Sequence, residues 1–477
     1  MINKIPVPQA KYKLLNSVQE KRWRSPVFYL ISLLLIIIGI LFITRGWFLI
    51  LTAISRSTES RTINFEDATI AAWSCRARMY AESSKENQDA DRNTTVTTAN
   101  SSTSFFTSSK IVVCYYTISS NMNTSWELSP AHIDPYICTH IIVGFASVVN
   151  CTISLGTAEE LLQQIINLKL HQPKLKVMVS ASGINELQHG FPEMVKTHAN
   201  RKLFIKSVLN LTRVYNLDGL DIDWEFPVWL GANDRQRIWF IQLLQETKKE
   251  FDRSGRNLTL SAAVASPVAI IDESYNVPEI AEHVDFINLM SYDYHYYVWY
   301  LPLTGLNAPM YAKLSDSGYA ATLNVNYSAM YWVSKGMPRE KIVIGIPTYG
   351  HSFKLDNVNN HGIMAPAKGF GHLGISGFTL YPTVCWFINT GANKVYDKDS
   401  RTPYVYKDDE WISYDDTTSV LEKVRWINAN GFKGAMVFSL NTDDWNATCD
   451  KKNTFPLTRV IAANIIGLSS KNTASGS

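Results

Sequence analysis

The sequence predicts an α/β fold, a (β/α)8 TIM barrel with a small α+β insertion between its seventh and eighth strands. Two observations predict it. Short apolar segments typical of buried strands alternate with amphipathic segments between residues 110 and 470. The gap before the last strand, residues 351–410, is rich in Gly, Pro, Asn and aromatic residues and is too long for a loop, so we expect an inserted subdomain there.

The elements follow from local patterns of hydrophobicity. Runs of Val, Ile, Leu and aromatic residues bounded by polar segments indicate strands, and apolar residues at helical spacing indicate helices. The expected strands are Ile111–Tyr116, His140–Ala146, Lys176–Ser182, Gly219–Trp224, Leu258–Val264, Phe286–Tyr292, Lys341–Thr348 and Ala435–Leu440. The expected helices include Ala158–Leu168, Arg201–Tyr215, Arg235–Phe251 and Thr417–Asn428.

Composition and charge restrict the partners. The chain has 477 residues and a formal net charge of +3, which gives no reason to expect nucleic acid as a partner. No Cys-x-x-Cys pair, phosphate loop or nucleophilic triad is visible, so we expect neither a metal nor a cofactor. The cysteines are Cys75, Cys114, Cys138, Cys151, Cys385 and Cys449.

The N-terminus predicts a membrane anchor. Residues 1–26 are basic and residues 27–51 are almost wholly apolar. A helix of about 18 apolar residues is about 27 Å long and crosses a bilayer core. Because the basic flank precedes the span, we expect a cytoplasmic tail, a transmembrane signal anchor and a lumenal or extracellular barrel, as in a single-pass type II membrane protein. The alternative is a cleaved signal peptide and a secreted protein, although Thr52-Ala53-Ile54 is a poor cleavage site.

Residues 52–109 are expected to form a stem. The stretch Asn93–Ser109 is dominated by Thr, Ser and Asn and cannot bury enough apolar area to order itself. Residues 471–477 form a short polar tail after the barrel. Glycosylation sequons fit a lumenal side, which also permits disulfides, and they occur at Asn93, Asn100, Asn123, Asn150, Asn210, Asn257, Asn326 and Asn446.

An acidic array lies within one predicted strand. Asp221, Asp223 and Glu225 are two residues apart and therefore share one strand face, while apolar residues alternate with them on the other face. Three carboxylates on one face are costly to bury, because each loses water and repels its neighbours. The alternative is a solvated surface strand, but the flanking Leu217 and Phe226 are too apolar for one. We therefore expect an active-site array at the end of a barrel strand.

Several motifs resemble glycoside hydrolase family 18, the chitinases and chitinase-like lectins, from about Lys110 to about Leu468. The most specific is Asp218-x-x-Asp221-x-Asp223-x-Glu225, which matches the family signature in full. Supporting matches are Cys114-Tyr115-Tyr116, Gly144-Phe145-Ala146, Met290-Ser291-Tyr292-Asp293, Gly345-Ile346-Pro347-Thr348-Tyr349-Gly350 and Gly434-Ala435-Met436-Val437.

The resemblance implies hydrolysis in which the substrate's own N-acetyl oxygen is the nucleophile. Glu225 is then the general acid and later the base. Asp223 binds the acetamido N–H, and the deeper Asp221 shares a proton or hydrogen bond with it, which raises at least one pKa. Tyr292, on the same face of the sixth strand as Met290, donates to the acetamido oxygen. Asp218 has the opposite strand parity, so its expected role is structural.

Further residues are implied to contact the sugar, with core packing as the alternative for each. Hydroxyl contacts are implied for Asp293, Tyr115 and Tyr349, and an apolar cleft surface for Phe145, Met290 and Phe438.

The chain also departs from the family pattern. Phe438 takes the place of a tryptophan on the last strand, Ile184 that of a tryptophan after the third strand, and Ser119 lies near a third lost tryptophan. In the third-strand motif, normally Ser-x-Gly-Gly, the chain has Ser180-Ala181-Ser182-Gly183. Trp299, in a long aromatic loop, either rebuilds one stacking surface or is a simple exposed aromatic.

The resemblance implies the disulfides Cys114–Cys138 and Cys385–Cys449, each stabilising by a few kcal/mol. Cys75 and Cys151 remain; they either pair, or Cys75 links two chains.

These features predict hydrolysis of β-1,4-linked N-acetylglucosamine polymers or oligosaccharides of the chitin type. The alternative is a chitinase-like lectin that binds N-acetylglucosamine oligosaccharides with little turnover, and a membrane-tethered scaffold is a third reading. The intact Glu225 favours the enzyme, and the lost tryptophans favour the lectin.

Overall fold

The computed structural model describes residues 110–118, 128–156, 159–184, 190–229 and 232–468, which belong to one compact unit. The predicted tail (1–26), signal anchor (27–51), stem (52–109) and C-terminal tail (471–477) lie outside the described residues, and so their structure is untested. Among the helices in the described part of the chain, none is both long enough and apolar enough to cross a membrane.

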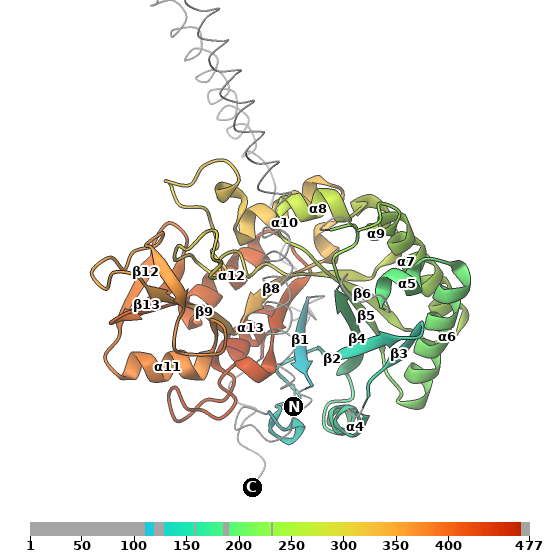
Figure 1. Cartoon of the computed structure of the whole chain (residues 1–477). Helices are drawn as coiled ribbons and strands as arrows, with labels where there is room; N and C mark the ends of the chain where they lie inside the picture. The colour runs from blue at the N-terminus through green and yellow to red at the C-terminus, as the bar shows by residue number, and fades with distance from the viewer. Residues whose placement is uncertain (1–109, 119–127, 157–158, 185–189, 230–231, 469–477) are drawn as a thin grey trace, which may run out of the picture. The chain divides into compact units, whose positions relative to one another are not determined.

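Eight parallel strands close into a barrel, as the sequence predicts (Figure 1). Their order is β1-β15-β8-β7-β6-β5-β4-β2, and the pairing of β1 with β2 completes the circle. A short strand, β3 (Thr152–Ser154), adds an antiparallel hairpin to β2. The barrel strands are β1 (Ile111–Thr117), β2 (His140–Val149), β4 (Lys176–Ile184), β5 (Gly219–Glu225), β6 (Thr259–Val264), β7 (Phe286–Leu289), β8 (Ile342–Pro347) and β15 (Gly434–Phe438).

The sixth barrel strand, β7, is shorter than predicted. It ends at Leu289, so Met290 and Tyr292 lie beyond it rather than on it. The N–H of Met290 still binds the carbonyl of Val264 on β6, but the N–H of Ser291 turns back to the carbonyl of Leu289. The chain therefore leaves the sheet before Tyr292, where the sequence pattern alone still indicates a strand.

Alternation along the strands separates the barrel interior from the helical layer. On β5, Leu220, Ile222 and Trp224 pack outward in the large core beneath the helices, and Trp224 stacks on Phe191 with ring centroids 5.4 Å apart. The interior is filled from other strands by Val113, Ile142, Met178, Phe286, Val343 and Met436. Because the two sets alternate, the odd-numbered acids of β5 point into the barrel.

Helices surround the barrel at the predicted positions, and several shorter ones complete the layer. A capping box in which the side chain of Asp416 accepts from the N–H groups of Thr418 and Ser419 begins α12. The α-helices are α4 (Glu159–Asn167), α5 (Phe191–Val195), α6 (His198–Val214), α7 (Gln236–Arg253), α8 (Val268–Ser274), α9 (Val277–His283), α10 (Val325–Ser334), α11 (Tyr381–Asn389), α12 (Thr417–Ala429) and α13 (Pro456–Ile465). Short 3-10 turns occur at Pro130–His132, Leu168–Leu170, Ala320–Thr322, Arg339–Lys341 and Leu440–Thr442.

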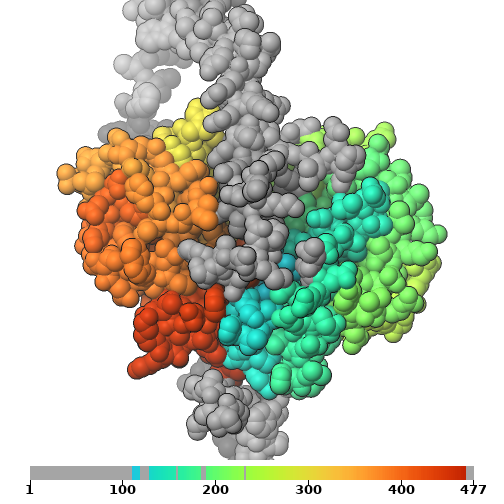
Figure 2. Space-filling view, turned by 60° about the horizontal axis from the view of Figure 1, so that its bottom comes forward, coloured from blue at the N-terminus to red at the C-terminus, as the bar shows by residue number. Residues whose placement is uncertain are grey.

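A second, antiparallel sheet follows β8, in the part of the chain where the sequence predicts an insertion. Its order is β10-β9-β14-β13-β12, with β11 on the other side of β9, and α11 packs beside it. Figure 2 shows this segment in orange on one side of the visible face, away from the green residues of α5 to α7. Its strands are β9 (Tyr349–Leu355), β10 (Ala367–Phe370), β11 (Phe378–Leu380), β12 (Asn393–Asp397), β13 (Thr402–Lys407) and β14 (Glu410–Ser413).

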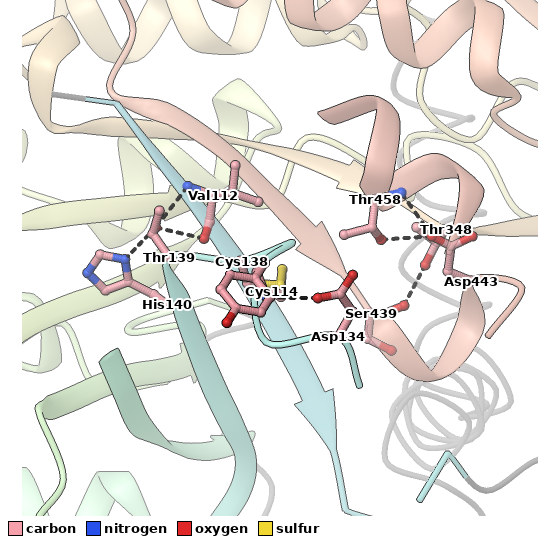
Figure 3. The surroundings of a disulfide bond; sticks show 11 residues. Val112, Cys114, Asp134, Cys138, Thr139, His140, Thr348, Ser439, Asp443 and Thr458 are labelled. Carbon is pink, nitrogen blue, oxygen red and sulfur yellow. Dashed lines mark hydrogen bonds between the residues drawn. A yellow bond between two sulfur atoms is a disulfide. The ribbon is translucent and has the colours of Figure 1, made fainter. Parts of the chain in front are cut away.

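Two disulfides are present within the described residues, and both are the predicted ones. Cys114–Cys138 ties β1 to the segment before β2, beside the mutual hydrogen bonds of Val112 and Thr139 (Figure 3). Cys385–Cys449 joins α11 of the second sheet to the chain after β15. Cys151 is in no disulfide within the described residues, and Cys75 lies outside them, so the alternatives for this pair stay open.

Candidate active site

The acidic array of β5 lines the barrel interior, as predicted. Asp221 is fully buried, Asp223 is 5% exposed and Glu225, the last residue of the strand, is partly buried. The apolar residues between them face the helices. The alternative of a solvated surface strand is therefore wrong, because every residue of the strand before Glu225 is buried.

Asp221 is held by four donors from four other strands. One oxygen accepts from the Tyr115 hydroxyl at 2.7 Å and the Ser180 hydroxyl at 2.8 Å, and the other accepts from Ser261 at 2.7 Å and the amide of Asn288 at 3.2 Å. Burial raises the pKa of Asp221, and these four hydrogen bonds oppose that rise only in part.

The predicted proton sharing or hydrogen bond between Asp221 and Asp223 stays a prediction. The four donors that hold Asp221 come from β1, β4, β6 and β7. The pKa of Asp221 is raised as expected, and the cause is burial of the carboxyl group.

Asp223 lies one step further along the strand, toward its C-terminal end. Its Oδ2 accepts from the hydroxyl of Ser182, at 3.1 Å. Ser182 stands directly beside Asp223 in the parallel register of β4 and β5, as Ser180 stands beside Asp221. Each aspartate of the array thus has a serine of the neighbouring strand at its side.

Tyr292 reaches the same interior from the segment after β7. Its ring stacks on Phe438 at 5.7 Å and packs edge-on against Tyr349 at 6.0 Å. Burial, and then the negative charges of Asp293, Asp223, Glu225 and Asp221, raise the pKa of Tyr292 well above its usual value. The phenol therefore keeps its proton at neutral pH and can donate a hydrogen bond.

Asp293 joins the barrel to the second sheet. Its Oδ1 accepts from the Tyr349 hydroxyl and lies 2.8 Å from Nε2 of His351, and both of these residues belong to β9. The backbone of Asp293 has a φ of 61°, in the left-handed region that aspartate tolerates better than most residues. His351 is almost fully buried, so Asp293 is supported from behind by a packed side chain.

An aromatic cluster completes the interior. Tyr115 lies 6.1 Å from Phe145 and 5.6 Å from Phe438, measured between ring centroids. Met290 and Phe145 are partly buried and pack on the same cluster. The residues predicted to shape the cleft, Phe145, Met290 and Phe438, are therefore brought together and pack in the barrel interior.

Asp218 lies outside this cluster. Its carboxylate accepts from Nζ of Lys169 and from the N–H of Val177, both at 2.7 Å. These contacts fasten the start of β5 to the start of β4 and the turn before it. They fit the structural role predicted from its strand parity.

Comparison with known proteins identifies the family. The sequence profile of glycosyl hydrolases family 18 matches residues 111–443. The chain belongs to this family. It is 36% identical over 363 residues to human chitinase-3-like protein 2, covering 74% of this chain and 92% of that one, and 36% identical over 362 residues to mouse chitotriosidase-1, covering 73% and 77%.

Solved structures similar to this one include a chitinase described as active and a protein described as a pseudo-chitinase. An immunomodulatory active chitinase from Trichuris suis matches with a TM-score of 0.70 at 31% identity, covering 75% of this chain and 100% of that one. Human YKL-39, described as a pseudo-chitinase with retained chitooligosaccharide-binding properties, matches with a TM-score of 0.70 at 35% identity, covering 75% and 99%. Membership of family 18 thus includes both turnover and binding.

Several residues of the site were not assigned from the sequence, namely Ser180, Ser182, Ser261, Asn288 and His351. Ser180 and Ser182 carried a usable signal, because they are two apart on a strand that neighbours the acidic one. His351 carried none, since its contact with Asp293 spans 58 residues and two sheets.

The sequence departs from the family pattern near Ser119 and at Ile184. Ser119 lies outside the described residues, and the backbone of Ile184 pairs beside Glu225 in the register of β4 and β5. Trp299 is 47% exposed and packs edge-on against Tyr300.

Proposed function

We propose that this protein hydrolyses β-1,4-linked N-acetylglucosamine chains by a retaining, substrate-assisted mechanism. The observation that carries the proposal is the acidic array inside the barrel, with Glu225 at the C-terminal end of β5 and Tyr292 in the same interior. In TIM barrels this end of the strands carries the active site.

Glu225 is the proton donor and acceptor in this proposal. In the first step its carboxyl proton goes to the glycosidic oxygen, which leaves with the bond electrons, while the acetamido carbonyl oxygen bonds to the anomeric carbon and forms an oxazolinium ion. In the second step the Glu225 carboxylate takes a proton from water, whose oxygen attacks the same carbon and reopens the ring. The stereochemistry is retained because each of the two displacements inverts the configuration at the anomeric carbon.

Asp223 and Tyr292 orient the substrate's own nucleophile. The carboxylate of Asp223 accepts the acetamido N–H, which increases the nucleophilicity of the carbonyl oxygen. The protonated phenol of Tyr292 donates to that oxygen and holds it in line with the anomeric carbon. Asp221 supports Asp223 from below and adds to the negative potential of the site.

The remaining residues bind the sugar. Asp293, Tyr115 and Tyr349 contact hydroxyl groups, while the apolar surface is supplied by Phe145, Met290 and Phe438. The partner is therefore chitin or an N-acetylglucosamine-containing oligosaccharide.

A second candidate function is oligosaccharide binding with little turnover. The observation that favours it is Phe438, which offers the sugar less stacking area than the tryptophan usual at this position and no indole N–H. One human relative of the same fold is described as a pseudo-chitinase that retains binding. The presence of Glu225 supports hydrolysis over this alternative.

We also propose a cellular location for the barrel, outside the cytoplasm. The basic and apolar N-terminal segments support a type II membrane protein with its barrel outside the cytoplasm, carrying N-linked sugars. Sequencing of the mature N-terminus distinguishes this from secretion, because a start near residue 55 would show that the apolar segment is removed.

The test of hydrolysis uses the purified protein and a fluorogenic chito-oligosaccharide glycoside. We expect wild type to release the fluorophore and Glu225→Gln to lose at least about a hundredfold in kcat, because the general acid is removed. Glu340→Gln is the matched control, since this glutamate is exposed and follows α10, away from the array.

Binding of the unlabelled oligosaccharide is measured in parallel by calorimetry. If wild type and Glu225→Gln both stay at background while binding persists, the hydrolase proposal is wrong and the lectin is supported. If wild type neither binds nor cleaves, both candidate functions are wrong.

A further inference from the structure

Strand β4 carries a pair of hydroxyl groups that matches the two aspartates of β5. The two strands run parallel, and their register places Ser180 beside Asp221 and Ser182 beside Asp223. Both hydroxyls donate to Oδ2 of the neighbouring carboxylate, at 2.8 Å from Ser180 and 3.1 Å from Ser182. Two serines spaced two residues apart on one face of β4 therefore lie beside two aspartates with the same spacing on β5.

The two serines have different surroundings. Ser180 is fully buried and is one of four donors around Asp221, so no single one of them decides where that carboxylate lies. Ser182 is partly buried and stands one step closer to the open end of the barrel. Its hydroxyl acts on the carboxylate that is proposed to hold the acetamido N–H.

We propose that Ser182 is a positioning residue that fixes the carboxylate of Asp223 in the orientation that binds the acetamido group. This inference rests on the proposed role of Asp223 and names a residue that tunes it. A serine on a strand has one side-chain torsion with few preferred values, so its hydroxyl is a well-defined anchor. With Oδ2 anchored, the plane of the carboxylate is set, and so is the direction of its other oxygen.

The expected size of the effect follows from the kind of bond. A hydrogen bond to a charged group is stronger than one between neutral groups, although part of its contribution is recovered when water or a neighbour replaces the hydroxyl. We therefore expect loss of the Ser182 hydroxyl to weaken interactions made through Asp223 about tenfold. Interactions of the sugar made elsewhere should not change.

The test uses a ligand that binds without being turned over. Chitobiose thiazoline imitates the oxazolinium ring and presents its nitrogen to Asp223, while the matching disaccharide with a 2-hydroxyl in place of the acetamido group does not. Dissociation constants for both are measured by calorimetry on wild type, Ser182→Ala and Ser182→Thr. Ser334→Ala, in which the changed residue lies on the outer helix α10, is the matched control.

The inference predicts a selective loss. Ser182→Ala should bind the thiazoline about tenfold more weakly, bind the 2-hydroxyl disaccharide as wild type does, and recover with Ser182→Thr, which restores a hydroxyl. A merely structural role would weaken both ligands equally, and that result would overturn the proposal. Unchanged thiazoline affinity in Ser182→Ala would overturn it too, while leaving the proposed function intact. Failure of wild type to bind the thiazoline would reject the proposed function and this inference together.

Discussion

The barrel interior has two ends that are built differently. At the inner end, Asp221 receives four hydrogen bonds from four barrel strands and is fully buried. At the outer end, Asp293 follows a strand rather than lying on one, keeps 18% of its side chain exposed and takes its donors from β9 of the second sheet. The inner end is fixed by the barrel itself, whereas the outer end depends on how the second sheet is placed against it.

Substitutions at the two ends should have different consequences, because the two carboxylates differ in their access to water. When a buried carboxylate is removed, each donor that bound it loses its acceptor, and no water takes the place of that acceptor. A partly exposed carboxylate at the mouth is less costly to disturb, because water can take the place of either partner. Mutations at the inner end should therefore affect folding first, and those at the outer end should affect sugar binding.

The largest effect is expected for Asp221→Leu. Leucine leaves the hydroxyls of Tyr115, Ser180 and Ser261 and the amide of Asn288 without their common acceptor. Each unsatisfied buried group costs about 1–3 kcal/mol, but removing a carboxylate whose pKa is already raised by burial returns part of this. We expect the free energy of unfolding to fall by about 3 kcal/mol or more in chemical denaturation.

Asp221→Asn is the matched variant for that measurement. It keeps one acceptor oxygen and nearly the same shape, so its loss should be less than half that of the leucine variant. A leucine variant as stable as wild type would show that the inner end does not depend on this carboxylate.

The second effect is a pH dependence at the start of β2, below the acidic array. His140 is 7% exposed, packs edge-on against Phe286 and shares a hydrogen bond with Thr139 (Figure 3). Burial, followed by the charges of Lys176 and Lys433, lowers the pKa of His140 from 6.5 to about 3. The neutral form is therefore the one that the folded protein accommodates.

The direction of this pH dependence follows from the linkage between proton binding and folding. The unfolded chain binds the proton below pH 6.5 and the folded protein only near pH 3, so the contribution of His140 is complete above pH 6.5 and is lost as the pH falls toward 3. Between pH 7 and pH 4 the loss should be about 3 kcal/mol. The free energy of unfolding is measured by denaturant at the two pH values, and His140→Gln should lose less of it between pH 7 and pH 4 than wild type does. An equal loss in the two proteins would contradict the prediction.

Much of the inner end could be predicted from the sequence, because strand periodicity decides which residues face the interior. It placed Asp221, Asp223 and Glu225 together, and the eight strand positions followed from apolar runs. The further partners of Asp221 could not be predicted in this way, because periodicity says nothing about strands distant in the sequence. The donors Tyr115 and Asn288 lie 106 and 67 residues away from Asp221.

The outer end was less accessible to this reasoning. The pattern up to Tyr292 still indicates a strand, but the backbone leaves the sheet after Leu289 and Asp293 adopts a positive φ. These changes depend on the packing of the second sheet, whose strands pair across long stretches of chain. The identity of the residues at the mouth could therefore be predicted from the local sequence, but their hydrogen-bond partners could not.

The smallest expected effect tests the outer end itself. His351→Leu removes the ring nitrogen that lies 2.8 Å from Asp293 and keeps a buried apolar side chain in its place. If Asp293 binds a sugar hydroxyl, losing one of its two supports from β9 should weaken chito-oligosaccharide affinity about fivefold, because the carboxylate becomes less well oriented. His351→Gln, which can still donate from an amide nitrogen, should lose less. Affinity is measured by calorimetry on the three proteins, and thermal unfolding checks that each of them is folded. A leucine variant that loses stability without losing affinity would contradict this prediction. His351 would then have a structural role, like the residues of the inner end.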